Sequence, residues 1–246
     1  MDRSAYQLHL EVDRSHFWRA AKRDLLRDLL TEIGPPEREL RLLDIGGASS
    51  LYPAVLAEWG SVTVVEPDGE CVKTAKAVLE TDIRQGSLPD DLGVEGPFDV
   101  ISMLDVLEHI EDDQRALEVV RGLLAPDGRL ILTVPALPVL YSDHDRALHH
   151  FRRYTQRSLT ESIEGAGLRV QRMSYWTSLL LPLVAAQRSI SKARSWLRPN
   201  PNPEYSVKLP GETLNSMLGA AMTMERYLLR SMRMPAGSSL FAIAVG

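Results

Sequence analysis

The segment 42–50 carries residues suited to binding a nucleotide. It reads Leu-Leu-Asp-Ile-Gly-Gly-Ala-Ser-Ser, and Glu66 follows Asp44 by 22 positions at the end of the next apolar run. At the carboxyl edge of a parallel sheet, a turn of small residues lets a ligand approach the backbone, and an acid on the neighbouring strand accepts from both ribose hydroxyls. A tight strand-to-helix turn explains the small residues alone, but the acid at this interval favours a site for an adenosine nucleoside.

Histidines supply the second kind of chemistry, because an imidazole accepts a proton near neutral pH. His109 follows the apolar run 98–104, where a histidine that merely caps local structure is the alternative. His144 and His150 lie in the polar segment 141–154, for which the alternative is a solvated loop held by internal ion pairs. If the acceptor of the reaction is a hydroxyl, we predict that its base is one of these three histidines, with His144 and His150 as the leading candidates.

The polar segment also contains oxygen and nitrogen ligands that suit a metal ion. The candidate metal ligands are Asp143, His144, Asp145 and His150. Of the adjacent pair His149 and His150, we consider His149 the weaker candidate for any role. Loop residues of these types are common, however, and no ligand spacing is diagnostic. We therefore expect no metal site.

Alternating strand and helix patterns place these side chains at one edge of a sheet. Strands are expected at 40–45, 62–65, near Ile83, and at 98–104, 129–134, 168–174 and 239–245. Helices are expected at 51–59, 71–79, 112–124, 156–165, 177–198 and 212–232, after a leading amphipathic helix that begins at Trp18 and is stopped by Gly34-Pro35-Pro36. This alternation predicts an α/β fold with a doubly wound, mostly parallel sheet and helices on both faces.

Four further blocks follow the first, in a fixed order. They are Val-Val-Glu-Pro-Asp at 64–68, Phe-Asp-Val-Ile at 98–101, Asp-Val-Leu-Glu-His at 105–109, and Leu-Leu-Ala-Pro-Asp-Gly-Arg-Leu-Ile-Leu-Thr-Val-Pro at 123–135. Together the five blocks make residues 16–173 resemble the class I S-adenosylmethionine-dependent methyltransferases. The resemblance implies a seven-stranded Rossmann-like sheet and S-adenosylmethionine as cofactor. The cofactor-binding residues that it implies are Asp44, Gly46, Gly47, Ala48, Glu66, Pro67, Gly86, Ser87, Leu88, Leu104 and Asp105.

Three positions depart from the family pattern. Ala48 and Ser50 stand where the turn usually has further glycines, and Ser87 stands where an aspartate commonly accepts from the adenine amino group. Small side chains preserve close approach to the backbone, and a serine still hydrogen-bonds, although without the strength of a carboxylate. A nicotinamide dehydrogenase is the competing reading, but the first turn lacks G-x-G-x-x-G.

Two further segments resemble a subset of these methyltransferases. In that subset a His-x-Arg-Arg-Tyr block, here 150–154, closes over the acceptor together with an aspartate-rich turn. The subset also begins with His-Phe-Trp, here 16–18, on a helix that lies over the cofactor. A simple anchor between Phe17, Trp18 and the sheet is the favoured reading of the second segment.

Composition bounds the remaining possibilities. The chain has 246 residues, 44% of them hydrophobic, and a net charge of −5, which predicts a single globular domain and argues against nucleic-acid binding. Only one cysteine, Cys71, is present, and no signal-peptide pattern or apolar run of membrane-spanning length occurs, so a cytoplasmic location is expected.

The charge is divided unevenly along the chain. Residues 1–164 hold 18 basic and 30 acidic residues, whereas 165–246 hold 10 basic and 3 acidic ones. An apolar stripe at 179, 183, 186, 190, 193 and 197 makes the helix 177–198 amphipathic, with Arg188, Lys192 and Arg198 off the stripe. Packing of the stripe on the second helix, through Leu214, Met217, Ala221 and Met224, is the favoured prediction. An anionic membrane surface and an acidic substrate are the alternatives.

These patterns predict one methyltransferase domain, with a helical lead at 1–35, a cofactor-binding core at 36–176, a helical cap at 177–235 and the last strand at 236–246. The expected reaction is methyl transfer to a small-molecule or carrier- or lipid-linked biosynthetic intermediate by in-line displacement. A non-methylating cyclisation in natural-product biosynthesis and a non-catalytic cofactor-binding subunit are the alternatives, because a fold does not fix its chemistry.

Overall fold

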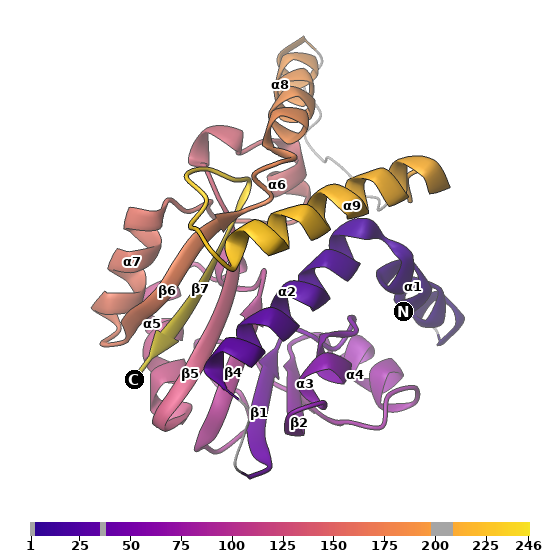
Figure 1. Ribbon diagram of the computed structural model, residues 1–246. Helices are drawn as coiled ribbons and strands as arrows, with labels where there is room; N and C mark the ends of the chain where they lie inside the picture. The colour runs from indigo at the N-terminus through magenta and orange to yellow at the C-terminus, as the bar shows by residue number, and fades with distance from the viewer. Residues whose placement is uncertain (1–2, 35–37, 198–208) are drawn as a thin grey trace.

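A seven-stranded sheet forms the centre of the computed structural model, which describes residues 3–34, 38–197 and 209–246. The strand order is β3-β2-β1-β4-β5-β7-β6, in which β7 runs antiparallel to both of its neighbours and the other pairs are parallel (Figure 1). The strands are β1 Leu40–Ile45, β2 Gly60–Glu66, β3 Asp82–Gln85, β4 Phe98–Leu104, β5 Leu124–Pro135, β6 Arg169–Trp176 and β7 Ser239–Val245. The predicted mostly parallel α/β sheet is confirmed.

Helices connect the parallel strands, as the alternation predicted. They are α2 Phe17–Ile33, α3 Tyr52–Leu56, α4 Gly69–Lys76, α5 Asp113–Leu123 and α7 Gln156–Gly165. The inner strands are apolar on both faces, and β7 is buried along its whole length, because helices cover the two sides of the sheet. The parallel strands β1, β2 and β4 end side by side in the loops that carry the predicted cofactor residues.

The chain also forms an N-terminal helix, α1 Arg3–Ser15. The sequence analysis included these residues in the helical lead at 1–35 but did not predict a separate helix there. Tyr6 is fully buried and donates its hydroxyl hydrogen bond to the carbonyl of Ala48 in the loop after β1. Asp13 accepts from Arg23 Nη1 at 2.8 Å and from the backbone N–H of Leu51 at 3.2 Å. Helix α1 is therefore attached directly to the predicted cofactor loop.

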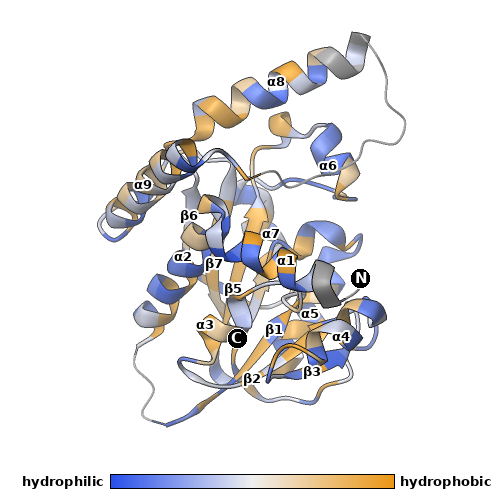
Figure 2. Cartoon of the chain, turned by 90° about the vertical axis from the view of Figure 1, so that its right-hand side faces the viewer, coloured by the Kyte–Doolittle hydropathy of each residue, from blue (hydrophilic) through white to orange (hydrophobic). Residues whose placement is uncertain are grey.

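Two helices are inserted between β6 and β7, as predicted, but their packing differs from the prediction. Helix α8 Leu181–Leu197 extends away from the sheet (Figure 2), and α9 Glu212–Leu229 packs along α2 instead. Five of the side chains expected to join the two helices are exposed by half or more: Leu183 56%, Ile190 53%, Leu214 52%, Met217 66% and Met224 61%. The predicted pairing of the two apolar stripes is therefore wrong.

Polar contacts explain where α9 lies. Arg226 forms ion pairs with Asp24 at 2.7 Å and with Asp28 at 2.8 Å on α2, and the buried Glu225 accepts from the backbone N–H groups of Ser178 and Leu179 ahead of α8. Because these contacts turn one side of α9 toward α2, its remaining apolar side chains face outward.

Some predicted features lie outside the described residues. They are Pro35 and Pro36 of the helix stop, Arg198, and residues 199–208 of the proline-rich connector. Within the described ranges, no helix combines the length and the apolar character that crossing a bilayer requires. We retain the division into lead, core, cap and last strand as a proposal.

Candidate cofactor and acceptor site

The loop after β1 brings the backbone close to a buried carboxylate. Asp44 is 1% exposed, and its Oδ1 accepts from Ser102 Oγ at 2.5 Å, while Oδ2 has no hydrogen-bond partner among the described residues. Gly46 adopts φ +81°, and a Cβ at Gly47 would lie 1.7 Å from Asp44 Oδ2. Glycine is therefore required at both positions, as the small-residue turn predicted.

A cavity of about 300 Å³ opens at this edge of the sheet. Seven of the eleven predicted cofactor residues line it: Gly46, Glu66, Pro67, Gly86, Ser87, Leu88 and Asp105. The other four, Asp44, Gly47, Ala48 and Leu104, do not line the cavity. Of these, Asp44, Ala48 and Leu104 are buried beside it and support the loops that form its wall. The sequence reading missed Ile45, Val106 and Ile110, which add apolar side chains that suit an adenine ring.

An ion pair between a buried lysine and a partly exposed aspartate joins α2 to the end of β4, and the sequence analysis missed the lysine. Lys22 is 2% exposed and bonds to Asp105, whose Oδ1 also accepts from Thr133 Oγ1 at 2.9 Å. Burial alone disfavours both charges, but their attraction raises the pKa of Lys22 and lowers that of Asp105. Lys22 lies on the same buried side of α2 as Leu25 and Leu29. A lysine at helical spacing within this apolar side was the sequence signal that could have predicted a buried ion-pair partner.

Three side chains gather beside the cavity. Glu108 and His109 belong to the short 3₁₀ helix η1 Leu107–His109, and His150 lies in the polar segment, with its Nε2 4.0 Å from Glu108 Oε1. The rings of His109 and His150 meet edge to face, 4.6 Å apart. His109 is exposed on its outer side, but its partial enclosure, with a smaller contribution from His150, lowers its pKa to about 4.

The polar segment is held by a buried carboxylate rather than solvated. Asp145 of α6 Asp143–Ala147 is fully buried, and its Oδ1 lies 3.1 Å from His150 Nδ1 and 2.7 Å from Arg153 Nε. The backbone N–H of Phe151 donates to the carbonyl of Glu108 at 2.8 Å, which fixes the segment over η1. Because Asp145 already serves His150 and Arg153, the structure does not favour the metal group considered within 143–150.

His144, the third predicted base, lies on α6 next to the same cluster. Burial and the neighbouring Arg188 lower the pKa of His144 to about 4. It does not line the cofactor cavity, whereas His109 does. The structure thus brings His109 and His150 together and leaves His144 one step further from the cavity.

The segment 17–173 matches the family described as Methyltransferase domain, and this match covers more than half of the chain. The chain belongs to the class I S-adenosylmethionine-dependent methyltransferases. S-adenosylmethionine is accordingly the cofactor of this methyltransferase.

Individual relatives are more distant. A ubiquinone biosynthesis O-methyltransferase of Xanthomonas euvesicatoria pv. vesicatoria is 27% identical over 155 residues, covering 54% of this chain and 64% of its own length. The match thus spans less than two thirds of that curated relative. An S-adenosylmethionine-dependent methyltransferase of Clostridium acetobutylicum is 10% identical with a TM-score of 0.58, covering 92% of this chain and 91% of its own.

A third relative was solved with the cofactor. Phosphoethanolamine N-methyltransferase 2 of Haemonchus contortus, in complex with S-adenosyl-L-methionine, is 15% identical with a TM-score of 0.54. The match covers 89% of this chain and 51% of the worm protein. At these identities the solved structures establish the shared fold alone.

The residues of this methyltransferase fit that cofactor. Asp44 Oδ2 is buried and has no donor within the part of the chain that the structure describes, and a side chain at residue 47 would fill the space over it. Glu66 lies in the cavity wall, where burial raises the pKa of its carboxyl, and the two hydroxyls of a ribose are the donors that such an acid accepts from.

Two departures from the family pattern have local explanations. Ser50 Oγ donates to the carbonyl of Gly47 at 2.9 Å and accepts from the backbone N–H of Tyr52 at 3.2 Å, so that the serine closes the turn and begins α3. Ala48 is fully buried, and its carbonyl accepts from Tyr6. A longer side chain at residue 48 would disturb the contact with α1.

The pH dependence of cofactor binding tests the role of Asp44. Burial raises the pKa of Asp44 to about 7, against a smaller opposing effect of the Ser102 hydrogen bond. The carboxyl is therefore mostly protonated at pH 6 and mostly ionised at pH 8. Because S-adenosylmethionine is cationic, we expect its affinity to rise roughly three- to tenfold over this interval, measured by isothermal titration calorimetry. In D44N only the pH dependence of the ligand itself should remain, and an unchanged slope in this variant would contradict the assignment.

The His-Phe-Trp segment serves as an anchor. His16 Nδ1 accepts from the backbone N–H of Trp18 at 3.2 Å and so caps α2. The Trp18 ring lies 4.6 Å from that of Trp176 at the end of β6, and Lys22 Nζ lies 5.2 Å from the Trp18 ring. The favoured prediction, that this segment fixes the helix to the sheet, is confirmed.

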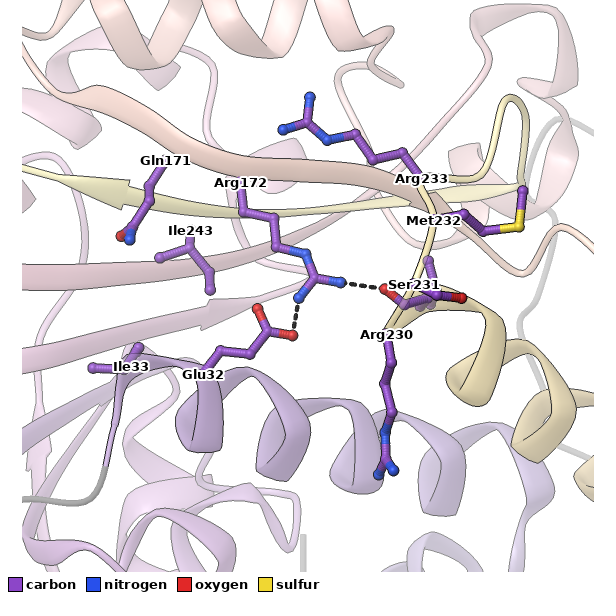
Figure 3. Close-up of a pocket in the computed structure, with 10 residues that line it drawn as sticks. Glu32, Ile33, Gln171, Arg172, Arg230, Ser231, Met232, Arg233 and Ile243 are labelled. Carbon is purple, nitrogen blue, oxygen red and sulfur yellow. Dashed lines mark hydrogen bonds and ion pairs between the residues drawn. The ribbon is translucent and has the colours of Figure 1, made fainter.

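A second cavity, of about 400 Å³, lies between α2, β6 and the end of α9 (Figure 3). Arg172, Arg230 and Arg233 line it, and Arg172 bonds to Glu32 and donates to the carbonyl of Leu229 at 2.6 Å. Its polar groups thus join α9 to the rest of the fold, and none of the predicted site residues reaches it.

Proposed function

We propose that this methyltransferase transfers a methyl group to a hydroxyl oxygen of a small-molecule acceptor that enters beside His109. The observation that supports the proposal is the position of His109, which lines the cofactor cavity and also contacts the buried His150. The O-methyltransferase name of the curated relatives supports oxygen as the atom methylated. The bound cofactor supplies an electrophilic methyl group on a sulfonium sulfur.

The chain's own residues have three tasks in this reaction. The segment 141–154, fixed over η1, excludes water from the space beside the cavity, and in-line transfer depends on such exclusion and alignment. Asp145 orients the imidazole of His150 through Nδ1. The acceptor hydroxyl loses its proton at the cluster of Glu108, His109 and His150, where His109 is the leading base candidate. His144 of α6 lies next to this cluster and interacts electrostatically with His150.

The acceptor class that we propose rests on helix α8, which contacts α6 of the polar segment. Helix α8 carries no acidic residue and leaves Leu183 and Ile190 exposed. An apolar or carrier-linked biosynthetic intermediate, or an anionic one, suits such a neighbour. We propose this class without assigning an individual compound.

The proposed reaction is tested with donor labelled in the methyl group. The purified chain is incubated with the donor and with a panel of phenols, catechols and primary amines, and products are identified by mass spectrometry. We expect label on a hydroxyl oxygen of at least one phenol or catechol. Transfer exclusively to nitrogen or carbon would contradict O-methylation, and tight binding of the cofactor without transfer to the panel or to a cell extract would contradict a transferase.

A further inference from the structure

The cluster beside the cofactor cavity has the composition of a cation site. Glu108, His109 and His150 each offer one ligand atom, and these three atoms lie within 4.8 Å of one another. Glu108 is fully buried, and neither of its carboxylate oxygens accepts a hydrogen bond from any part of the chain that the structure describes. Buried carboxylates are normally paired or coordinate a metal, so the side chain of Glu108 requires a partner of this kind.

The imidazole of His150 is oriented from behind in the way that metal-binding histidines are. His150 Nδ1 is hydrogen-bonded to Asp145, which directs Nε2 toward Glu108. The His109 ring is held by its edge-to-face contact with the His150 ring, 4.6 Å apart. A histidine that ligates a metal usually gives its other ring nitrogen to a carboxylate or a carbonyl, and such partners fix the tautomer and the ring orientation.

We propose that Glu108, His109 and His150 bind one divalent cation of the zinc, cobalt or manganese type. Two imidazoles and one carboxylate are a ligand set for these ions, and three protein ligands leave coordination positions for an oxygen of the acceptor. Metal–ligand bonds of about 2.1 Å place ligand atoms about 3.4 Å apart in tetrahedral geometry, so the cluster needs to contract only slightly around an ion. The site shares only His150 with the group considered from the sequence.

A bound cation would determine how the acceptor hydroxyl loses its proton at this cluster. In this respect the inference rests on the proposed function. An acceptor hydroxyl bound to a divalent cation is more acidic than a free one, so it can release its proton to water near neutral pH before the methyl group is transferred, and neither His109 nor His150 has to act as the base. Because His109 also lines the cofactor cavity, an oxygen held at the cluster lies next to that cavity. The structure thus favours an acceptor with a hydroxyl that chelates or binds metal, such as a catechol.

Binding is measured directly with Co²⁺, whose visible absorption reports its ligands. The full chain is freed of metal with a chelator and titrated with Co²⁺ alone, followed by absorption and calorimetry. We expect one ion per chain, and at least tenfold weaker binding in both E108Q and H150Q. E161Q is the matched control, since Glu161 is an exposed partner of Arg157 on α7, and its binding should equal that of the wild type. The variants are first shown to bind S-adenosylhomocysteine normally, which verifies that they are folded.

Equal Co²⁺ binding by wild type, E108Q and H150Q would overturn the cation site, as would the absence of binding in the wild type. The proposed transferase is judged separately by label transfer. Transfer by metal-free protein would leave the reaction standing with a histidine as its base, whereas metal binding without any transfer would contradict only the reaction.

Discussion

The variant E66A is expected to lose about 100-fold or more of its affinity for S-adenosylhomocysteine. Glu66 is the acid in the cavity wall at the end of β2, where the family resemblance places the ribose hydroxyls. Hydrogen bonds to a charged group contribute about 1.5–3 kcal/mol each, and two of them would be lost together. Titration calorimetry measures the loss. E66Q should lose less, because an amide oxygen still accepts one of the two bonds.

Glu70 offers a matched control on the adjoining helix α4. Its carboxylate is exposed and pairs with Lys73 at 2.6 Å, outside the cavity wall. Because surface pairs of this kind contribute little, E70A should bind the ligand as the wild type does. An E66A protein that binds within fivefold of wild type would show that the nucleoside is held elsewhere.

The sheet and its cofactor edge were predictable from sequence because their signals are local. Each parallel strand appears as a short apolar run, because a strand that is covered on both faces needs apolar side chains on both of them. The turn at Gly46 and Gly47 and the acid at Glu66 are set by backbone geometry and by the ligand. The same physical demands act on every sheet that binds a nucleoside in this way, so the sequence pattern was sufficient to predict the cofactor edge.

The contacts between distant segments were not predictable in the same way. Glu108 and His150 stand 42 positions apart, and contacts between their segments bring them together, among them the backbone bond from Phe151 to Glu108 and the ion pair of Arg152 with Asp113. The apolar stripes of α8 and α9 predicted a helix pair, since packing on a neighbour is the simplest way to bury a stripe. Ion pairs between α9 and α2 determined the partner instead, and periodicity carries no information about such pairs.

The uneven distribution of charge is partly explained by these ion pairs. Arg226 and Arg230 of the basic C-terminal part pair with Asp24 and Asp28 of the acidic N-terminal part. Some of the asymmetry therefore serves attachment of α9 to α2 within one chain. On α8, Arg188 donates to Ser142 Oγ at 3.2 Å and Lys192 donates to the carbonyl of Val139 at 2.6 Å, so these charges also make contacts within the chain.

Substituting Asp145 with alanine is expected to lower the free energy of unfolding by about 3–5 kcal/mol. The carboxylate is fully buried, and it accepts from Arg153, from the backbone N–H of Ser142 at 2.9 Å and from His150. Its removal leaves the guanidinium of Arg153, itself 8% exposed, buried without its ionic partner. Urea unfolding followed by circular dichroism measures the loss.

The control and the pH dependence make this prediction specific. E161A removes an ion pair with Arg157 whose two side chains are mostly exposed, and it should change stability by less than about 1 kcal/mol. Burial alone would raise the pKa of Asp145, but His150 and Arg153 lower it below the unfolded value. The contribution of the carboxylate is thus complete above pH 4 to 5 and declines as the pH falls toward the folded pKa. The difference between wild type and D145A should therefore be largest near neutrality and shrink in acid. Equal stability of D145A and E161A at pH 7 would show that Asp145 does not hold this segment over the cofactor edge.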